Sequence, residues 1–233
     1  MPDIGQALAY YAVFLFSVTL HEAAHAWAAM LGGDKTAYHG GQVSLDPRPH
    51  IRREPMGLLW IPLISALLTG WPIGFASAPY DPAWARRHPK RAAWMALAGP
   101  AANLLLVLLA FAALRLGASA GLFFAPERVG FDQLAATGAG TIWSSVVFIL
   151  SVVLSLNLLL AVLNLFPFPP LDGSGVVPLF LNDTATVKYQ DFIWNNRGLG
   201  IIGILIAWQV FSHVYDPIFL LTINLLYPGA GYR

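Results

Sequence analysis

Long apolar stretches dominate this chain, and its polar residues gather in the connections between them. A membrane-spanning helix needs about 20 predominantly apolar residues. Four stretches satisfy that requirement clearly, and the fourth is interrupted at Asp216-Pro217: residues 4–31, 92–116, 141–166 and 199–227. We therefore predict an all-α polytopic membrane protein built as a helical bundle.

A fifth apolar stretch is shorter and irregular. Residues 56–69 carry Pro62 and continue into a segment, residues 70–79, that is rich in glycine and proline. Irregular backbone at membrane depth is tolerated only where protein or water covers it. Residues 56–79 are thus either a short span or a re-entrant segment, which gives about five transmembrane or re-entrant segments in total.

Two segments between the first and second clear spans have weak strand character. Residues 38–45 (YHGGQVSL) and 72–78 are each flanked by turn residues. We predict short β-strand-like segments at these two places.

Composition supports a membrane protein and narrows the possible ligands. Charged residues make up 11% of the chain, against roughly a quarter in soluble domains. The net charge of +1 gives no indication of nucleic acid as a partner, and the absence of cysteine restricts any metal to histidine, carboxylate or carbonyl ligands. Met1-Pro2-Asp3 lacks the basic start of a signal peptide, so we expect the first span to be retained.

The basic residues suggest an orientation. They cluster after the first span, before the second clear span and before the last one: Lys35, Arg48, Arg52 and Arg53; Arg86, Arg87, Lys90 and Arg91; Lys188 and Arg197. The positive-inside rule places all three clusters in the cytoplasm. This requires residues 56–79 to return to the side on which they began.

Three ionisable residues lie inside the first apolar stretch, in the sequence HEAAH: His21, Glu22 and His25. On a helix the H-E-x-x-H spacing brings both imidazoles to one face, where they can bind a zinc ion while the glutamate acts as general base. The alternative is a pair of histidines that form interhelical hydrogen bonds. Ionisable residues are costly at membrane depth, which favours a metal site.

A catalytic zinc needs a third protein ligand, and Asp172 is the best candidate. It follows the third clear span in the sequence NLFPFPPLDG, whose prolines end the helix. The alternative is a simple Asp-Gly turn at a membrane exit. In the predicted topology, however, HEAAH, Asp172 and the segment from Gly99 to Asn103 lie at similar depth on one side, which favours one shared site.

Other polar residues have weaker assignments. Asn164 is predicted to orient ligands or to bind substrate backbone. Asn103 is predicted either to have the same role or to form an interhelical hydrogen bond, and Asn157 is predicted to form an interhelical hydrogen bond. Three histidines in basic loops are predicted to be solvated: His39, His50 and His88. His213 and Asp216 could touch a metal or a proton path, although Asp216-Pro217 more simply marks a helix break.

Taken together, HEAAH, GPAAN (residues 99–103) and NLFPFPPLDG (residues 164–173) resemble the site-2 protease family of intramembrane zinc metalloproteases. The resemblance covers most of residues 8–175. It implies that His21, His25 and Asp172 bind Zn²⁺, that Glu22 is the catalytic base, and that Asn164 contacts substrate backbone.

The resemblance also implies an activity: a zinc metalloendopeptidase that hydrolyses a peptide bond within or near a transmembrane segment of a membrane-protein substrate, as in regulated intramembrane proteolysis. We expect a multi-pass protein of a prokaryotic cytoplasmic membrane, with its active site near the cytoplasmic side. The rivals are a membrane metal transporter and an inactive scaffold. The concentration of the polar residues at one depth disfavours the first, and the intact HEAAH and Asp172 disfavour the second.

Residues 1–233 are expected to form one domain, with a catalytic core at about 8–175 and a C-terminal span at 199–227. We find neither a PDZ insertion nor a CBS domain, so the chain resembles a minimal core. A substrate helix must unwind before cleavage, and we hypothesise that a strand edge within residues 38–45 or 72–78 receives it by β-addition.

Overall fold

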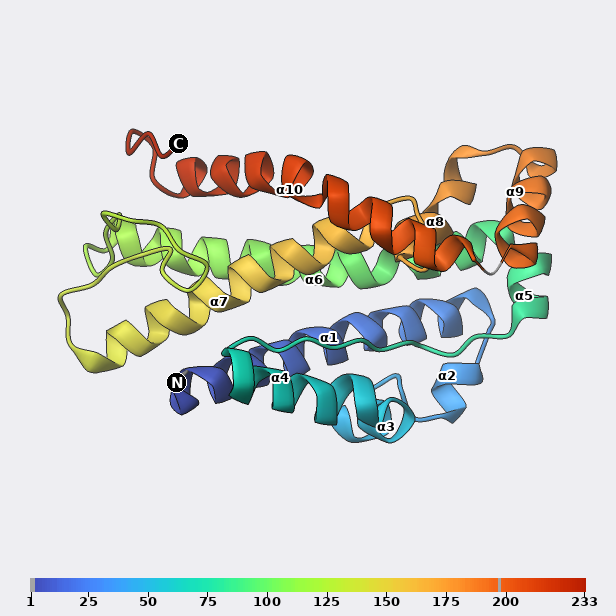
Figure 1. Ribbon diagram of the computed structural model, residues 1–233, viewed down its shortest axis with the longest axis horizontal. Coiled ribbons are helices and arrows are strands. Elements are labelled where there is room, and N and C mark those ends of the chain that lie inside the picture. Colours follow the sequence, from blue (N-terminus) through green and yellow to red (C-terminus); the bar gives the residue numbers. More distant parts are fainter. Residues whose placement is uncertain (1–2, 197) are drawn as a thin grey trace.

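The computed structural model describes residues 3–196 and 198–233; Met1, Pro2 and the basic residue Arg197 lie outside the described residues. The elements follow one another as helices (Figure 1): α1 (Ile4–Gly32), α2 (Thr36–His39), α3 (Pro47–Arg53), the π-helical turn η1 (Met56–Trp60), α4 (Ile61–Thr69), α5 (Pro82–Arg87), α6 (Pro89–Ser119), α7 (Thr141–Asn164), α8 (Asp172–Val176), the 3₁₀ turn η2 (Val177–Phe180), α9 (Asp183–Asn195) and α10 (Leu199–Leu226).

Four of the described helices are long and apolar enough to cross a membrane: α1, α6, α7 and α10. They coincide with the four predicted spans, and the all-α class is confirmed. Helix α6 packs extensively against both α1 and α7, whereas α10 lies along α7 with few contacts to α6 (Figure 1). The protein is therefore an integral, multi-pass membrane protein whose last helix is the least enclosed.

Local sequence explains where the first span begins and ends. The Asp3 side chain accepts a hydrogen bond from the backbone N–H of Gln6 at the start of α1, which satisfies one of the free donors of a helix N-terminus. At the other end Gly33 adopts a left-handed φ of 100° and donates to the carbonyls of Ala29 and Met30. Only glycine takes up this conformation without strain, so α1 stops there.

Residues 56–79 return to the side of the molecule on which they begin, so of the two predicted alternatives the structure contains the re-entrant one. Helix α4 packs against α1 and ends at Gly70, after which the chain runs back toward α5 without regular structure (Figure 1). The returning segment is bound to the outgoing one at Ile73, whose N–H donates to Ser65 Oγ over 2.8 Å, and at Phe75, whose N–H donates to the Gly57 carbonyl over 3.1 Å.

The predicted β-strand-like segments are wrong for the part of the chain that is described, which contains no strand. Residues 38–45 form the end of α2, a turn at Gly40 and Gly41, and bends. Residues 72–81 are irregular, and no neighbouring strand among the described residues provides the ladder that would make residues 72–78 a strand. Their turn-rich composition favours an open backbone, and the helical surroundings offer them only single hydrogen bonds.

Candidate metal centre

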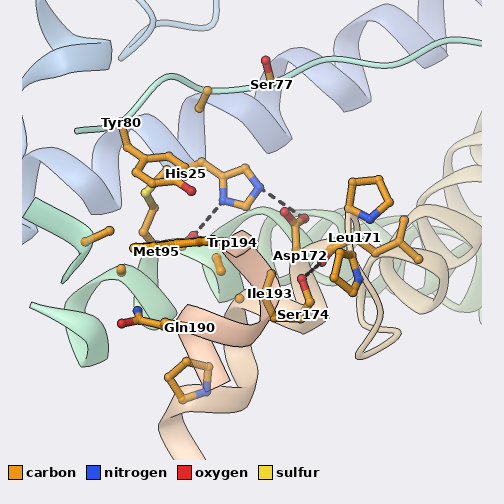
Figure 2. A pocket seen from close by; sticks show the side chains of 18 of the residues that line it. His25, Ser77, Tyr80, Met95, Leu171, Asp172, Ser174, Gln190, Ile193 and Trp194 are labelled. Carbon is orange, nitrogen blue, oxygen red and sulfur yellow. Dashed lines mark hydrogen bonds and ion pairs between the residues drawn. The ribbon is translucent and has the colours of Figure 1, made fainter. Parts of the chain in front are cut away.

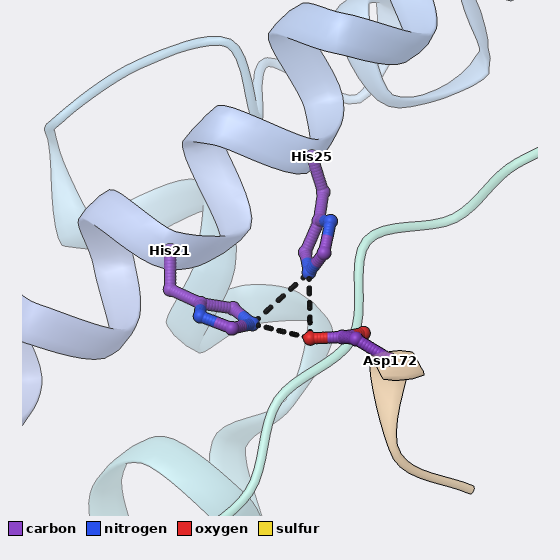
Figure 3. A group of neighbouring side chains, drawn as sticks. All are labelled: His21, His25 and Asp172. Atoms are coloured by element: carbon purple, nitrogen blue, oxygen red, sulfur yellow. Dashed lines mark hydrogen bonds and ion pairs between the residues drawn. The ribbon is translucent and has the colours of Figure 1, made fainter. Parts of the chain in front are cut away.

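Two histidines of α1 and one aspartate of α8 converge on a single point (Figure 3). His21 and His25 lie one helical turn apart, and their Nε2 atoms are 3.0 Å from each other. Asp172 Oδ2 lies 3.0 Å from His21 Nε2 and 3.3 Å from His25 Nε2. The structure thus brings together the three residues that the sequence predicts as metal ligands.

A backbone carbonyl fixes the orientation of His25. The Nδ1 atom of this ring lies 2.7 Å from the Met95 carbonyl oxygen of α6. Because a carbonyl only accepts, Nδ1 carries the proton and donates it. The lone pair of the neutral ring is then on Nε2, which faces Asp172 (Figure 2).

A chain of buried amides fixes His21 in the same way. Asn103 Nδ2 of α6 donates to Asn157 Oδ1 of α7 over 2.8 Å, so Asn103 Oδ1 is the atom that faces His21 Nδ1 at 2.6 Å. Asn157 in turn donates to Ser17 Oγ of α1 over 2.9 Å. Asn103 thus fits both of its predicted alternatives, because its Oδ1 orients His21 and its Nδ2 forms an interhelical bond to α7. Asn157 forms the interhelical bonds predicted for it.

The three converging atoms suit a cation. Both Nε2 atoms present lone pairs, and Asp172 Oδ2 is buried without a hydrogen-bond donor among the described residues. Two imidazole nitrogens and one carboxylate oxygen form a donor set that zinc accepts in catalytic sites, so the residues fit the ion.

Space at this point depends on Gly99 of α6. A Cβ atom at this position would collide with the Nε2 atoms of both His21 and His25. The glycine therefore keeps the lone-pair side of the imidazoles open, which gives its place in the sequence GPAAN a physical reason.

Glu22 lies next to the imidazoles and faces the same cavity. Its side chain is buried, and its Oε2 atom has no hydrogen-bond partner among the described residues. The cavity has a volume of about 380 Å³ and is lined by Glu22, His25 and Asp172 together with residues from α6, α9 and the segment between α4 and α5. A carboxylate with a free oxygen beside three candidate ligands is suitably placed to take a proton from a water molecule.

Aromatic residues also line this cavity, and sequence reasoning missed them. Tyr80 precedes α5 and Trp194 lies on α9; both line the cavity beside the metal centre (Figure 2). Helix α9 is held in place by Arg86 of α5, which lies 4.7 Å from the Trp194 ring centroid and 3.8 Å from Asp191 Oδ1. No motif connects Tyr80 and Trp194 to the first span, so only the fold reveals their position.

Asn164 is not among the residues that line this cavity. It is the last residue of α7, it is partly buried, and its side chain has no hydrogen bond to another described residue. Its predicted contact with substrate backbone stays a prediction.

The remaining histidines lie away from the metal centre. His50 is buried, and its Nε2 atom lies 3.0 Å from the Ser44 carbonyl, so the prediction that it is solvated is wrong; it ties α3 to the preceding loop. His39 is exposed and His88 is partly buried. His213 and Asp216 are exposed on α10 and do not belong to the cluster formed by His21, His25 and Asp172.

Comparison with known proteins finds relatives that are named as putative zinc metalloproteases. The chain is 32% identical over 166 residues to "Putative zinc metalloprotease YwhC" of Bacillus subtilis, a match that covers 70% of this chain and 64% of the relative. It is 35% identical over 176 residues to "Putative zinc metalloprotease Rip2" of Mycobacterium tuberculosis, which covers 72% of this chain and 58% of the relative. This chain thus spans roughly three fifths of the length of these curated relatives.

No solved structure matches the chain significantly. The sequence model of peptidase family M50, the site-2 protease family, matches residues 9–205. Since this match includes HEAAH, Gly99 to Asn103 and Asp172 and extends over most of the sequence, the chain belongs to peptidase family M50.

Proposed function

We propose that this protein is an intramembrane zinc metalloprotease that hydrolyses a peptide bond within or near a transmembrane segment of a membrane-protein substrate, as part of regulated intramembrane proteolysis. The observation that carries the proposal is the convergence of His21, His25 and Asp172 beside Glu22, at one cavity inside the bundle. In this proposal residues 8–175 are the catalytic core of one domain, and residues 199–227 add a span to it.

Each of these residues would have its own role in peptide-bond hydrolysis. His21, His25 and Asp172 would hold the zinc ion, which when bound polarises a carbonyl and acidifies water. Glu22 would take the proton of the attacking water and deliver it to the leaving amine. Asn103 and the Met95 carbonyl would keep the two imidazoles in the tautomer that ligation requires, while Asn164 would contact the substrate backbone.

The open segment that precedes α5 gives the substrate a place to bind. Ala76, Ser77 and Ala78 line the cavity in a segment without regular structure. An unwound substrate could lie along this segment and exchange backbone hydrogen bonds with it, as in β-addition. This version of the hypothesis needs no strand in the free protein, only accessible N–H and carbonyl groups.

Proline substitution tests the substrate-binding step. Ala76→Pro removes one N–H from the segment, whereas Ala76→Ser keeps the N–H at similar side-chain size. We expect KM for a transmembrane peptide to rise about tenfold for the proline variant, the cost of one lost hydrogen bond to a bound peptide, with zinc content unchanged. Equal KM values for the two variants would remove this segment from the binding site.

The basic residues support an orientation with the metal centre near the cytoplasm. Lys35 follows α1, Arg86 and Arg87 end α5, and Lys90 and Arg91 begin α6. These residues belong to connections on the same side as the end of α1. The positive-inside rule assigns that side to the cytoplasm, and the membrane would be the cytoplasmic membrane of a prokaryote.

Replacing the proposed base separates this function from its rival, a membrane metal transporter. Glu22→Gln keeps the shape and removes the basic carboxylate, so we expect cleavage of a transmembrane substrate to fall by about 10²- to 10⁴-fold with zinc content unchanged. Asp172→Ala should lose both zinc and cleavage. Zinc uptake into proteoliposomes that persists in Glu22→Gln, without any cleavage by the unmodified protein, would instead identify a transporter.

A further inference from the structure

Helix α10 carries a stripe of polar residues that nothing in the metal centre uses. Gln209, Ser212, His213 and Asp216 follow one another at positions i, i+3, i+4 and i+7, so they lie on one face of the helix. All four side chains are exposed. In the described part of the chain, no hydrogen bond or ion pair links any of the four to another residue. We refer to these four residues as the polar stripe.

The polar stripe lies in the middle of the helix. Helix α10 has 28 residues, and at 1.5 Å per residue His213 lies about 20 Å from either end. Pro217 adds a further polar group, because it lacks the N–H that would bond the carbonyl of His213. In a span through a hydrocarbon core of about 30 Å, the whole stripe falls at the depth where exposed polar groups are most costly.

The contacts of α10 within the chain do not cover this stripe. The helix packs on α7 through other residues, among them Ala207, Phe211 and Tyr215, and the Tyr215 hydroxyl donates to the Ser155 carbonyl over 3.4 Å. The stripe also lies beyond residue 205, where the match to the family's sequence model ends. Its role therefore requires a partner outside the contacts just described.

We propose that the polar stripe is the interface of a homodimer, in which α10 of one copy packs against α10 of a second copy. The stripe is complementary to itself, because it carries an imidazole at position 213 and a carboxylate at position 216. A two-fold axis along the membrane normal keeps both copies in the same orientation and makes each contact occur twice. His213 of one copy then faces Asp216 of the other across an axial offset of about 4.5 Å, and Ser212 and Gln209 bond across the same interface.

Cysteine cross-linking tests the interface directly, since the chain contains no cysteine. Ser212→Cys places a thiol in the stripe. Val210→Cys is the matched control, because Val210 is exposed at nearly the same depth but faces another side of α10. In proteoliposomes of the full chain we expect oxidation to give a disulfide-linked dimer for Ser212→Cys and at most a trace for Val210→Cys. Equal dimer yields for the two variants, or a dimer in neither, would overturn the proposal.

A charge exchange distinguishes a second copy from a different partner protein. His213→Asp and Asp216→His each place like groups opposite one another, and we expect each to weaken dimerisation by about tenfold, the scale of two lost interhelical hydrogen bonds. The double variant His213→Asp/Asp216→His restores both pairs and should restore the dimer counted by single-molecule photobleaching. A double variant that stays monomeric would overturn the proposal. The readout is association and is independent of proteolysis, so failure here leaves the proposed protease function untouched.

Discussion

At the scale of single residues, the metal centre depends on acceptors that hold each imidazole by its Nδ1 atom. Asn103 Oδ1 holds His21, and the Met95 carbonyl holds His25. Only the first of these is a side chain and open to mutation. Asn103 therefore gives the sharper test of whether imidazole orientation controls metal binding.

Removing the acceptor of Asn103 should weaken zinc binding without removing a ligand. We expect Asn103→Leu to lower zinc affinity by about 10- to 100-fold, the usual cost of losing a partner of a metal-bound histidine. Equilibrium dialysis followed by elemental analysis measures this change. Asn103→Asp keeps an oxygen acceptor for His21, so its zinc affinity should fall much less. Equal affinities for both variants and the unmodified protein would show that His21 needs no such partner.

A methyl group at position 99 should block the same site sterically. A Cβ on Gly99 would collide with both Nε2 atoms, whereas Gly200 has open space around it. We expect Gly99→Ala to lose most bound zinc and at least about 100-fold in cleavage rate, because a displacement of about 1 Å at an active site has this effect. Gly200→Ala should match the unmodified protein. Full zinc occupancy in Gly99→Ala would contradict the collision.

Sequence reasoning predicted the three residues that the structure brings together, His21, His25 and Asp172, but not everything around them. The H-E-x-x-H spacing fixes the relation of His21 to His25 within one helix, and polar residues at a common depth identified Asp172. The contact with the Met95 carbonyl has no sequence signature, because every residue carries a backbone carbonyl. The burial of His50 was missed because a histidine in a basic loop is expected to be solvated. Only the fold shows that the Ser44 carbonyl lies beside it.

At the scale of elements, Asp34 connects the end of α1 with two other segments. Its Oδ1 atom accepts hydrogen bonds from the hydroxyl and the N–H of Thr36 at the start of α2, over 2.6 and 2.9 Å. Its Oδ2 atom accepts from the N–H of Asp81, just before α5, over 2.7 Å. This buried carboxylate thus fixes the far end of the re-entrant segment that lines the cavity.

Acid should loosen this connection. Burial by itself raises the pKa of Asp34, but the hydrogen bonds from Thr36 and Asp81 outweigh it and lower the pKa. The resulting stabilisation is complete above the ordinary aspartate pKa of about 4 and is lost as the pH falls through the lowered value. We expect Asp34→Asn to be less stable than the unmodified protein at pH 7 and to lose less on acidification, as measured by thermal unfolding in detergent. Glu127→Gln, in an exposed loop, should keep the original pH dependence.

The re-entrant segment also shows where an element-level prediction failed. Residues 72–78 have the composition of an extended chain, and the structure leaves them without helix. A strand, however, requires a partner with matching free N–H and carbonyl groups, and here helices surround the segment. Local composition predicts an open backbone; pairing depends on neighbours that are distant in sequence, such as Gly57.

At the scale of the whole molecule, the metal centre joins helices that are far apart in the sequence. His21 and His25 belong to α1, while Asp172 begins α8, after two further spans. Without a cation, three lone-pair atoms within 4.8 Å of one another face each other. A bound ion would therefore both remove this repulsion and link the first span to α8, which follows the third span.

Removal of the metal should lower the stability of the whole bundle. We expect chelation to reduce the unfolding temperature, and zinc at about 100 times its dissociation constant to restore about 2.7 kcal/mol. Differential scanning calorimetry in detergent measures the shift. Asp172→Ala, which lacks one of the three proposed ligands, should show a much smaller response to zinc. An identical unfolding temperature with and without chelator would mean that the ion contributes nothing to the assembly of the bundle.

The turn-back of residues 56–79 has a consequence for the two ends of the chain. Since Met56–Thr69 does not traverse the bundle, the described helices cross it an even number of times: α1, α6, α7 and α10. An even count brings the start of α1 and the end of α10 to one face of the bilayer, and both lie at the same end of the molecule in Figure 1. Reporter domains fused to either end would therefore share a compartment.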